Sequence, residues 1–297
     1  MSEEFITGVR YALTVCAVVA AVANLLVLVV FARTSRLRMK YYGLLINLTL
    51  ADLFYAVMAI AFTWGESDLL FLIFISGYFV GVWTILAEAV NRYLALTFVD
   101  TARYDELVTR NRLVGICALI WVVSFAVEIL PAYLAHEDVY HIIEGVVKPL
   151  VVFAFWLITA GLYFVVFRKI RRYTIHLATS SPPLQKPTED HQVRTRLSQI
   201  RRLLVTFMLI LVTSFVCWMP FSVIQMVQFF HGDLENLEAA YWMSGAIYCL
   251  APLINPFIYW LRLDGFREGW HQMFCGCFEK ESSPNIEAEN TISETGL

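Results

Sequence analysis

Three polar residues interrupt a strongly apolar stretch of the chain at residues 88–96, which reads EAVNRYLAL. Glu88 and Arg92 are four residues apart, and on an α-helix this spacing puts both side chains on one face with the acid on the favourable amino-terminal side. The chemistry open to them is ion pairing, and Asn91 offers hydrogen bonds without charge. Because the stretch 69–98 can cross a bilayer, these groups need partners or a function. The alternative is that Glu88 is protonated or bonded to polar groups of a neighbouring span.

The elements that must position these residues follow from composition. Of the 297 residues, 59% are hydrophobic and 16% are charged, whereas soluble domains carry roughly 45–50% and ~25%. The apolar residues come in blocks, each with the ~20 residues that a helix needs to span the hydrocarbon core. We therefore expect an all-α membrane protein, a seven-transmembrane helix bundle, with spans at 8–33, 41–64, 69–98, 111–134, 147–173, 197–230 and 237–261.

The positive residues predict the orientation of the bundle. If the amino terminus is outside, only Arg10 and Lys148 of the 22 Lys and Arg residues lie on the outer side, which satisfies the positive-inside rule. The acidic amino terminus does not resemble a cleavable signal peptide. We expect a multi-pass plasma membrane protein with an extracellular N-terminus (1–7), a seven-transmembrane domain (8–262), an interfacial helix (263–278) and a disordered cytoplasmic tail (279–297).

Several classes of function find no support in the sequence. It has no cluster of metal-ligand residues, no glycine-rich phosphate loop and no nucleophile–base pair, so neither an enzyme nor a metal or cofactor site is expected. No nucleic acid partner is expected either. Cys16, Cys117, Cys217 and Cys249 fall inside spans, which predicts no extracellular disulfide. A transporter or channel is a distant alternative, because no repeat relates the two halves and no polar path crosses the membrane.

Short motifs in the right order on successive spans carry a resemblance to a known family. They are Asn24 in the first span, NLTLADL with Asn47 and Asp52 in the second, NRY at 91–93 in the third, Trp121 in the fourth, CWMP at 217–220 in the sixth and NPFIY at 255–259 in the seventh. With these motifs the chain resembles a rhodopsin-like (class A) G protein-coupled receptor over all seven spans.

The resemblance implies which residues serve activation and coupling to a heterotrimeric G protein. Asn24, Asp52 and Asn255 are polar at mid-membrane depth, so we expect them to share hydrogen bonds in a knot that either fixes packing or also rearranges. The full set, with Glu88 added from its spacing, is Asn24, Asp52, Glu88, Asn91, Arg92, Tyr93, Tyr163, Pro220, Asn255, Pro256 and Tyr259. Pro220 and Pro256 predict bends in the sixth and seventh spans.

Departures from the family pattern concern the restraint on Arg92. Asn91 replaces the usual Asp, and the sixth span has Gln199 and Ile200 where many members place an acid. We expect Glu88 to be the substitute partner and the chain to signal without added ligand. Phe155 replaces the usual proline of the fifth span, and this change, with the missing outer cysteines, resembles the branch that includes melanocortin, cannabinoid and lysophospholipid receptors.

The ligand is expected to be a lipid or another apolar small molecule. Phe74 offers no counter-ion for an ammonium group, and Cys249 stands where opsins place the retinal lysine. Large aromatic residues in the outer halves of the spans predict an apolar cleft, although each alone could serve an interfacial belt or core packing; the predicted ligand residues are Phe74, Tyr78, Trp156, Trp218, Phe221 and Trp242. The alternatives are a cationic peptide attracted by acidic outer loops and Glu128, or activity with no ligand.

The segments after the last span predict further partners. Phe266, Trp270, Met273 and Phe274 recur on one helical face, which suits a helix lying in the membrane interface against lipid. Cys275 and Cys277 at its end are predicted palmitoylation sites. Ser and Thr residues among acids in the tail predict phosphorylation that an arrestin reads, and the final Thr-Gly-Leu resembles a ligand of PDZ domains. Residues 174–196 are expected to form a loop.

Overall fold

The computed structural model describes the backbone of residues 3–34, 37, 42–65, 67–98, 101–179, 187–232 and 235–274. Within these ranges the side chains are described except at 3, 101–102, 105, 173–179, 187–197, 199–200, 235–239 and 241–242. Seven of the described helical segments are long and apolar enough to cross a membrane.

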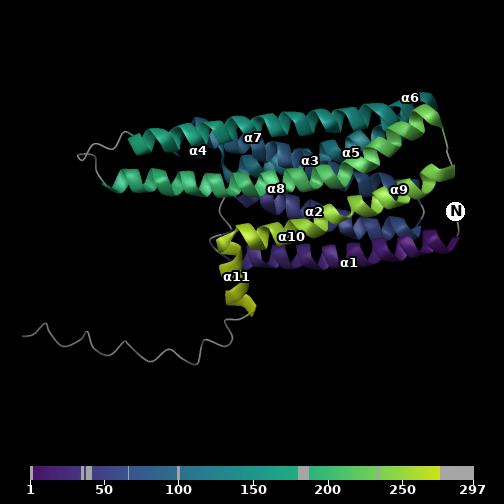
Figure 1. Cartoon of the computed structure of the whole chain (residues 1–297), viewed down its shortest axis with the longest axis horizontal. Helices are drawn as coiled ribbons and strands as arrows, with labels where there is room; N and C mark the ends of the chain where they lie inside the picture. The colour runs from purple at the N-terminus through teal and green to yellow at the C-terminus, as the bar shows by residue number, and fades with distance from the viewer. Residues whose placement is uncertain are drawn as a thin grey trace, which may run out of the picture.

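The helices run roughly parallel along the long axis of the molecule, and α11 turns across one end (Figure 1). The N-terminus and α6 lie at the opposite end, so we name the two ends the α11 end and the N-terminal end. In chain order the elements are α1 (Glu3–Arg33), α2 (Gly43–Gly65), α3 (Asp68–Thr97), α4 (Thr101–Leu107), α5 (Arg110–Leu134), α6 (Glu137–Ile142), the π-helix η3 (Ile143–Val147), α7 (Lys148–Thr179), α8 (Pro187–His231), α9 (Glu235–Tyr248), α10 (Leu250–Arg262) and α11 (Asp264–Phe274).

Helix α3 is the centre of the bundle, because it packs against α2, α5, α7 and α8. In α2 and α3, 56% of the most apolar stretch is buried inside the protein, against 22% in α5. Helix α5 therefore turns most of its surface outward. The large apolar side chains that remain exposed, such as Leu119, Val122, Phe164 and Phe257, form the surface that a bilayer would cover.

Several Ser and Thr hydroxyl groups inside the spans are satisfied by their own helices. Thr49 donates to the Leu45 carbonyl at 2.9 Å, and Thr84 donates to the Val80 carbonyl at 2.6 Å. The same four-residue back-bond recurs at Thr14, Thr63, Ser76, Thr159 and Thr206. Because no water is available in the hydrocarbon core, this pattern makes polar side chains tolerable there.

Helix ends and close approaches fix the two ends of the bundle. Thr109 caps α5 by accepting a hydrogen bond from the Arg112 amide. Gly232, with φ of 75°, follows the last residue of α8, and glycine is the residue that adopts this conformation without strain. At the α11 end, a Cβ on Gly269 would lie 2.1 Å from Thr34 Oγ1, so α11 packs against the end of α1 only because position 269 is glycine.

The predicted all-α seven-helix bundle and the short helix after the last span are confirmed, whereas the loop expected at 174–196 and some local details differ. Residues 174–179 and 187–196 are helical, since α7 and α8 continue past the other helices at the α11 end (Figure 1). Helix α4 and the π-helix η3 were not expected. The first helix begins at Glu3 rather than residue 8. The last span is divided into α9 and α10, with the break at Cys249.

Candidate functional site

An apolar cavity lies in the half of the bundle nearer the N-terminal end. It has about 500 Å³ of empty space. Helices α1, α2, α3, α8 and α9 supply its lining, together with the residue that separates α9 from α10; the lining residues are Leu13, Ala59, Phe62, Thr63, Phe71, Phe74, Ile75, Phe221, Gly245, Tyr248 and Cys249. A Cβ on Gly245 would meet nothing within 4 Å, so the cavity is open at this point of α9.

The structure distributes the six predicted ligand residues over different places. Phe74 and Phe221 line the apolar cavity. Tyr78 lines a second, central cavity, whereas Trp156 and Trp218 are buried and line neither of the two. Trp242 belongs to α9, but its side chain lies outside the described residues.

The aromatic residues of the outer halves that predicted the cleft also included Trp64 and Phe153, and these two face outward. Trp64 is 50% exposed and Phe153 is 37% exposed, so the expectation that they join the cleft was wrong. Trp64 instead packs on Tyr11 of α1, with ring centroids 5.4 Å apart, and donates to Thr14 Oγ1 at 3.0 Å. Both side chains belong to the surface that a bilayer would cover.

Stacked rings connect the two cavities. Tyr78 and Trp218 stack nearly parallel with centroids 5.6 Å apart, and Tyr248 lies 4.9 Å from Tyr78. Tyr248 also stacks on Phe221 at 5.7 Å. Tyr248 lines both cavities and contacts Tyr78, which stacks on Trp218. A molecule in the apolar cavity would therefore touch a side chain that contacts the stacking partner of Trp218.

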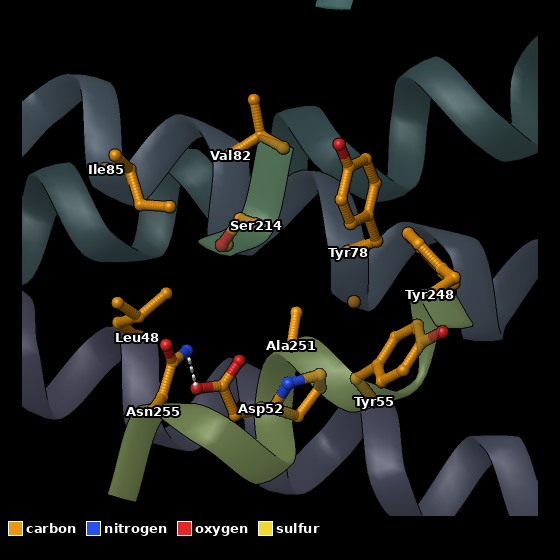
Figure 2. Close-up of a pocket in the computed structure, with 13 residues that line it drawn as sticks. Leu48, Asp52, Tyr55, Tyr78, Val82, Ile85, Ser214, Tyr248, Ala251 and Asn255 are labelled. Carbon is orange, nitrogen blue, oxygen red and sulfur yellow. Dashed lines mark hydrogen bonds between the residues drawn. The ribbon is translucent and has the colours of Figure 1, made fainter. Parts of the chain in front are cut away.

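The central cavity is lined by Asp52 of α2 and Asn255 of α10, and Figure 2 shows the Asn255 amide pointing at the neighbouring Asp52. Asn255 Nδ2 donates to Asp52 Oδ2 at 2.7 Å, and both residues are buried. Ser214 of α8 lines the same cavity, which has about 440 Å³ of empty space. The expected pairing of Asp52 with Asn255 is therefore present, and Ser214 brings α8 to it.

The third predicted member of the polar knot makes a different contact. Asn24 Nδ2 donates to the Pro252 carbonyl at 2.9 Å and to the Ala20 carbonyl of its own helix at 2.9 Å. Pro256 has no N–H to give to the carbonyl four residues earlier, which is that of Pro252. Asn24 thus satisfies the carbonyl that Pro256 leaves free, and it ties α1 to α10.

The break in the last span has a second proline as its cause. Helix α9 ends at Tyr248, and α10 begins at Leu250. Pro252 cannot donate to the carbonyl of Tyr248 and its ring crowds that carbonyl, so the helix ends where Pro252 requires it. Pro220 lies inside α8, which continues through it. Pro252 was not among the predicted hinge prolines, which were Pro220 and Pro256.

The predicted ion pair on α3 is present at the α11 end. Arg92 Nη2 pairs with Glu88 Oε1, and their side chains are 1% and 0% exposed. Asn91 Nδ2 donates to Glu88 Oε2 at 3.5 Å, and the Tyr104 hydroxyl of α4 donates to Asn91 Oδ1 at 2.9 Å. A connected polar cluster of Glu88, Asn91, Arg92 and Tyr104, which we name the α3–α4 cluster, therefore joins the two helices.

The tyrosines predicted from the family lie in different surroundings, and Tyr163 is beside this cluster. Tyr163 of α7 is buried with Glu88 and Arg92 as electrostatic neighbours, whereas Tyr93 has the Lys169 ammonium 5.5 Å above its ring. Tyr259 is fully buried on α10. Outside the spans, burial raises the pKa of Tyr42, against the smaller opposing effect of nearby Arg92 and Arg202.

A second ion pair at the α11 end involves α8. Arg202 pairs with Asp264 at the start of α11, and Arg267 pairs with the same carboxylate. The side chains of Arg202 and Asp264 are 50% and 42% exposed. Gln199 and Ile200 stand where an acid of the sixth span could have paired with Arg92. Arg202 of the same helix instead contacts an acid of α11.

A buried charge cluster lies between α5 and the start of α7. Lys148 Nζ is 2.7 Å from Glu128 Oε2 and also pairs with Glu144 of η3. Glu128 is fully buried, with one oxygen that has no hydrogen-bond partner among the described residues. Glu128 was expected to attract a cationic peptide, but its charge is matched by Lys148 and it lines neither cavity.

Sequence reasoning missed part of the apolar cavity. Phe62, Phe71 and Tyr248 line it, and Phe62 stacks on Phe74 with centroids 5.8 Å apart. Phe71 could have been predicted, because it lies one helical turn from Phe74 on α3. The contributions of Leu13 and Gly245 had no comparable signal, since neither residue type distinguishes a cavity from ordinary packing.

Comparisons with known proteins agree with this arrangement. The chain is 24% identical to cannabinoid receptor 1 of Xenopus laevis over 86% of this chain and 60% of the relative, and 25% identical to adenosine receptor A2a of Homo sapiens over 68% and 54%. It is 26% identical to galanin receptor type 1 of Mus musculus over 98% and 87%. The chain thus spans little more than half the length of the first two relatives.

The fold has a close counterpart among solved structures. Squid rhodopsin superposes with a TM-score of 0.78 at 16% identity, over 99% of this chain and 94% of that one. The sequence profile of the 7 transmembrane receptor (rhodopsin family) matches residues 23–259, which include α2–α9 and the Asp52–Asn255 and Glu88–Arg92 pairs. This family consists of signalling receptors rather than enzymes. The chain belongs to the rhodopsin family of seven-transmembrane receptors.

Proposed function

We propose that this receptor signals to heterotrimeric G proteins in response to an uncharged, largely apolar small molecule that binds in the apolar cavity. The observation that carries the proposal is the cavity lining, which contains no Asp, Glu, Lys, Arg or His among the described residues. Its polar groups are Thr63, Tyr248 and Cys249.

The charge arrangement disfavours a cationic peptide. A peptide cation would need a carboxylate in or beside the cavity, and the buried carboxylate of Glu128 is already paired with Lys148. The similar proteins do not decide the question, because their names refer to cannabinoids, adenosine and galanin. Membership of the predicted melanocortin, cannabinoid and lysophospholipid branch stays a prediction for the same reason.

The ligand effect would pass through Tyr248 and Trp218. A ligand that moves Tyr248 changes the packing around Tyr78 and Trp218, and Trp218 is two residues from Pro220 on α8. A helix with a proline there can bend without losing more hydrogen bonds. Ligand and G protein then prefer the same helix arrangement, so each raises the affinity of the other.

The α11 end is the proposed cytoplasmic face of the receptor in the plasma membrane. Among the described residues, every Lys and Arg except Arg10 and Lys148 lies toward this end, which agrees with the positive-inside rule. We assign the G protein contact to Arg92, α4 and the basic ends of α7 and α8, where Arg168, Arg171, Arg172, Arg201 and Arg202 lie.

Further partners involve α11 and the segment after it. Phe266 and Trp270 face the core beside Trp260, whereas Phe274 is 47% exposed, so α11 keeps an apolar edge for the lipid interface. Cys275, Cys277 and the tail lie outside the described residues. Palmitoylation of the two cysteines, arrestin recruitment and PDZ binding by the tail stay predictions.

A panel of G protein activation assays in cells tests the proposal. The compounds are uncharged monoacylglycerols, fatty acid amides and sterols, with arginine-rich peptides for contrast. We expect activation by members of the uncharged set alone. The variant Gly245→Leu should abolish that response at unchanged surface expression, because the new side chain has room to fill the cavity.

The matched control is Gly161→Leu. Gly161 lies on the exposed face of α7, and a Cβ there also meets nothing within 4 Å. This variant should respond like the wild type. A response to peptides alone, or a response that survives Gly245→Leu, would show that the ligand does not occupy the apolar cavity.

A further inference from the structure

We propose that Glu88 is the counter-ion that restrains Arg92 in the resting receptor, and that this pair sets the level of ligand-free signalling. The inference rests on the proposed coupling of the α11 end to a G protein. It assigns a regulatory function to a carboxylate inside α3, on the same helix as the arginine, rather than to an acid on a neighbouring span.

Geometry and burial support a strong interaction. The two side chains pair across one helical turn of α3 and are 1% and 0% exposed. An exposed pair at this spacing contributes only ~0.2–0.5 kcal/mol. A buried pair differs, because removing one partner leaves a charge in a low-dielectric site, which is strongly destabilising. The resting position of Arg92 therefore depends on the charge of Glu88.

The surrounding hydrogen bonds keep Glu88 in position. Asn91 Nδ2 donates to Glu88 Oε2, and Asn91 Oδ1 accepts from the Tyr104 hydroxyl. Tyr104 is fully buried on α4. The neutral amide at position 91 can donate to the carboxylate, whereas an Asp there would place two carboxylates 3.5 Å apart. Asn91 and Glu88 together therefore carry one negative charge, which matches the single positive charge of Arg92.

The described part of α8 carries a basic residue to the α11 end. Arg202, at the α11 end of α8, pairs with Asp264 of α11, so the described part of α8 contributes a cation there. When Arg92 leaves Glu88, it can extend toward the α11 end, where the proposed partner binds. Loss of the Glu88 charge removes the resting contact without changing the size of the side chain.

The test compares ligand-free G protein activation in cells at matched surface expression. We expect Glu88→Gln to raise activation about five-fold, the factor that corresponds to about 1 kcal/mol in the balance of resting and active states. The control is Glu128→Gln, which makes the same change at a buried carboxylate remote from Arg92 and should leave ligand-free activation unchanged. An unchanged signal in Glu88→Gln would overturn the proposal.

A charge exchange separates the counter-ion function from packing. The double variant Glu88→Gln with Asn91→Asp exchanges the amide and the carboxylate within the same hydrogen bond. It should return activation to near the wild-type level, because Arg92 again faces one negative charge. If the double variant stays as active as Glu88→Gln, a negative charge beside Arg92 does not restrain it, and the proposal is wrong.

A stability measurement distinguishes failure of this inference from failure of the proposed function. If no variant activates any G protein, the proposed coupling is wrong, and the ion pair is then judged on purified protein. Glu88→Gln should lower the midpoint of thermal unfolding, and Glu88→Gln with Arg92→Gln should recover most of the loss. Equal midpoints for wild type and Glu88→Gln would overturn the ion pair itself.

Discussion

The side-chain amide of Asn24 on α1 donates a hydrogen bond to the backbone carbonyl of Pro252 on α10, at 2.9 Å. Pro256 cannot use that carbonyl, because it has no N–H. A side chain of α1 thereby stabilises α10 at the backbone group that its proline leaves without a hydrogen bond. Polar residues at mid-membrane depth here satisfy the backbone groups that the hinges expose, as well as one another.

Removing this contact should destabilise the receptor in a way that depends on Pro256. We expect Asn24→Ala to cost about 1 kcal/mol, a typical net value for one hydrogen bond. In a Pro256→Ala background the cost should be smaller, because the alanine introduced there has an N–H that can donate to the Pro252 carbonyl within the helix. Thermal unfolding of the four proteins in one detergent measures this difference. Equal costs in both backgrounds would exclude the proposed compensation.

The buried charges between α5 and α7 should depend on Lys148. Lys148→Met leaves Glu128 and Glu144 without their cation, and we expect a loss of about 3–5 kcal/mol, the usual cost of breaking a buried pair. The double variant Lys148→Met with Glu128→Gln should be more stable than Lys148→Met, because one unpaired charge is gone. Unfolding midpoints test the order, and the reverse order would mean that Lys148 does not stabilise Glu128.

Trp218 should affect efficacy more than affinity. It stacks on Tyr78 but lines neither cavity, so Trp218→Ala should leave ligand affinity within about three-fold while the maximal response falls, as expected for a residue that couples rather than binds. Competition binding and G protein activation measure the two quantities. The control Trp64→Ala changes an outward-facing residue and should alter neither. Unchanged efficacy in Trp218→Ala would contradict the pathway.

The exposed ion pair of α8 with α11 should matter little. Arg202 and Asp264 are about half exposed, and such pairs contribute about 0–1 kcal/mol. Asp264→Asn should therefore change ligand-free signalling much less than Glu88→Gln does. The comparison is made in one assay at matched expression. A larger effect at Asp264 would place the main restraint between α8 and α11.

The sequence predicted the features that depend on residues close together in the chain, such as apolar blocks and the helical repeat. The seven apolar blocks indicated the bundle, because length and hydropathy determine whether a helix spans a membrane. The pair Glu88 and Arg92 could be predicted from four-residue spacing alone. Asp52 and Asn255 are 203 residues apart, and their common mid-membrane depth indicated that they would share a hydrogen bond.

Most other contacts between helices were beyond sequence reasoning. Lys148 of α7 pairs with Glu128 of α5, and the π-helix η3 lies directly before Lys148. No periodicity indicated that π-helix. Polar composition suggested a loop at 174–196, yet α7 and α8 continue into it, since Ser, Thr and charged residues are compatible with a solvated helix. The apolar cavity is open at Gly245 because this residue has no side chain. A glycine in the sequence alone does not show whether a cavity lies beside it.

The central claim is that the apolar cavity and the α11 end are coupled, and Cys249 can report on the cavity directly. In a receptor whose Cys16, Cys117, Cys217, Cys275 and Cys277 are replaced by Ala, an apolar maleimide labels Cys249, which lines the cavity. A compound that activates the receptor should slow this labelling when it binds. The concentration that gives half protection can then be measured with and without a purified nucleotide-free heterotrimer in nanodiscs.

We predict that the heterotrimer lowers this half-protecting concentration about ten-fold, a typical coupling between two sites, and that GTPγS reverses the change. Reciprocity requires this result if ligand and G protein favour the same helix arrangement. Protection that does not depend on the heterotrimer, or activation by a compound that never protects Cys249, would contradict the account.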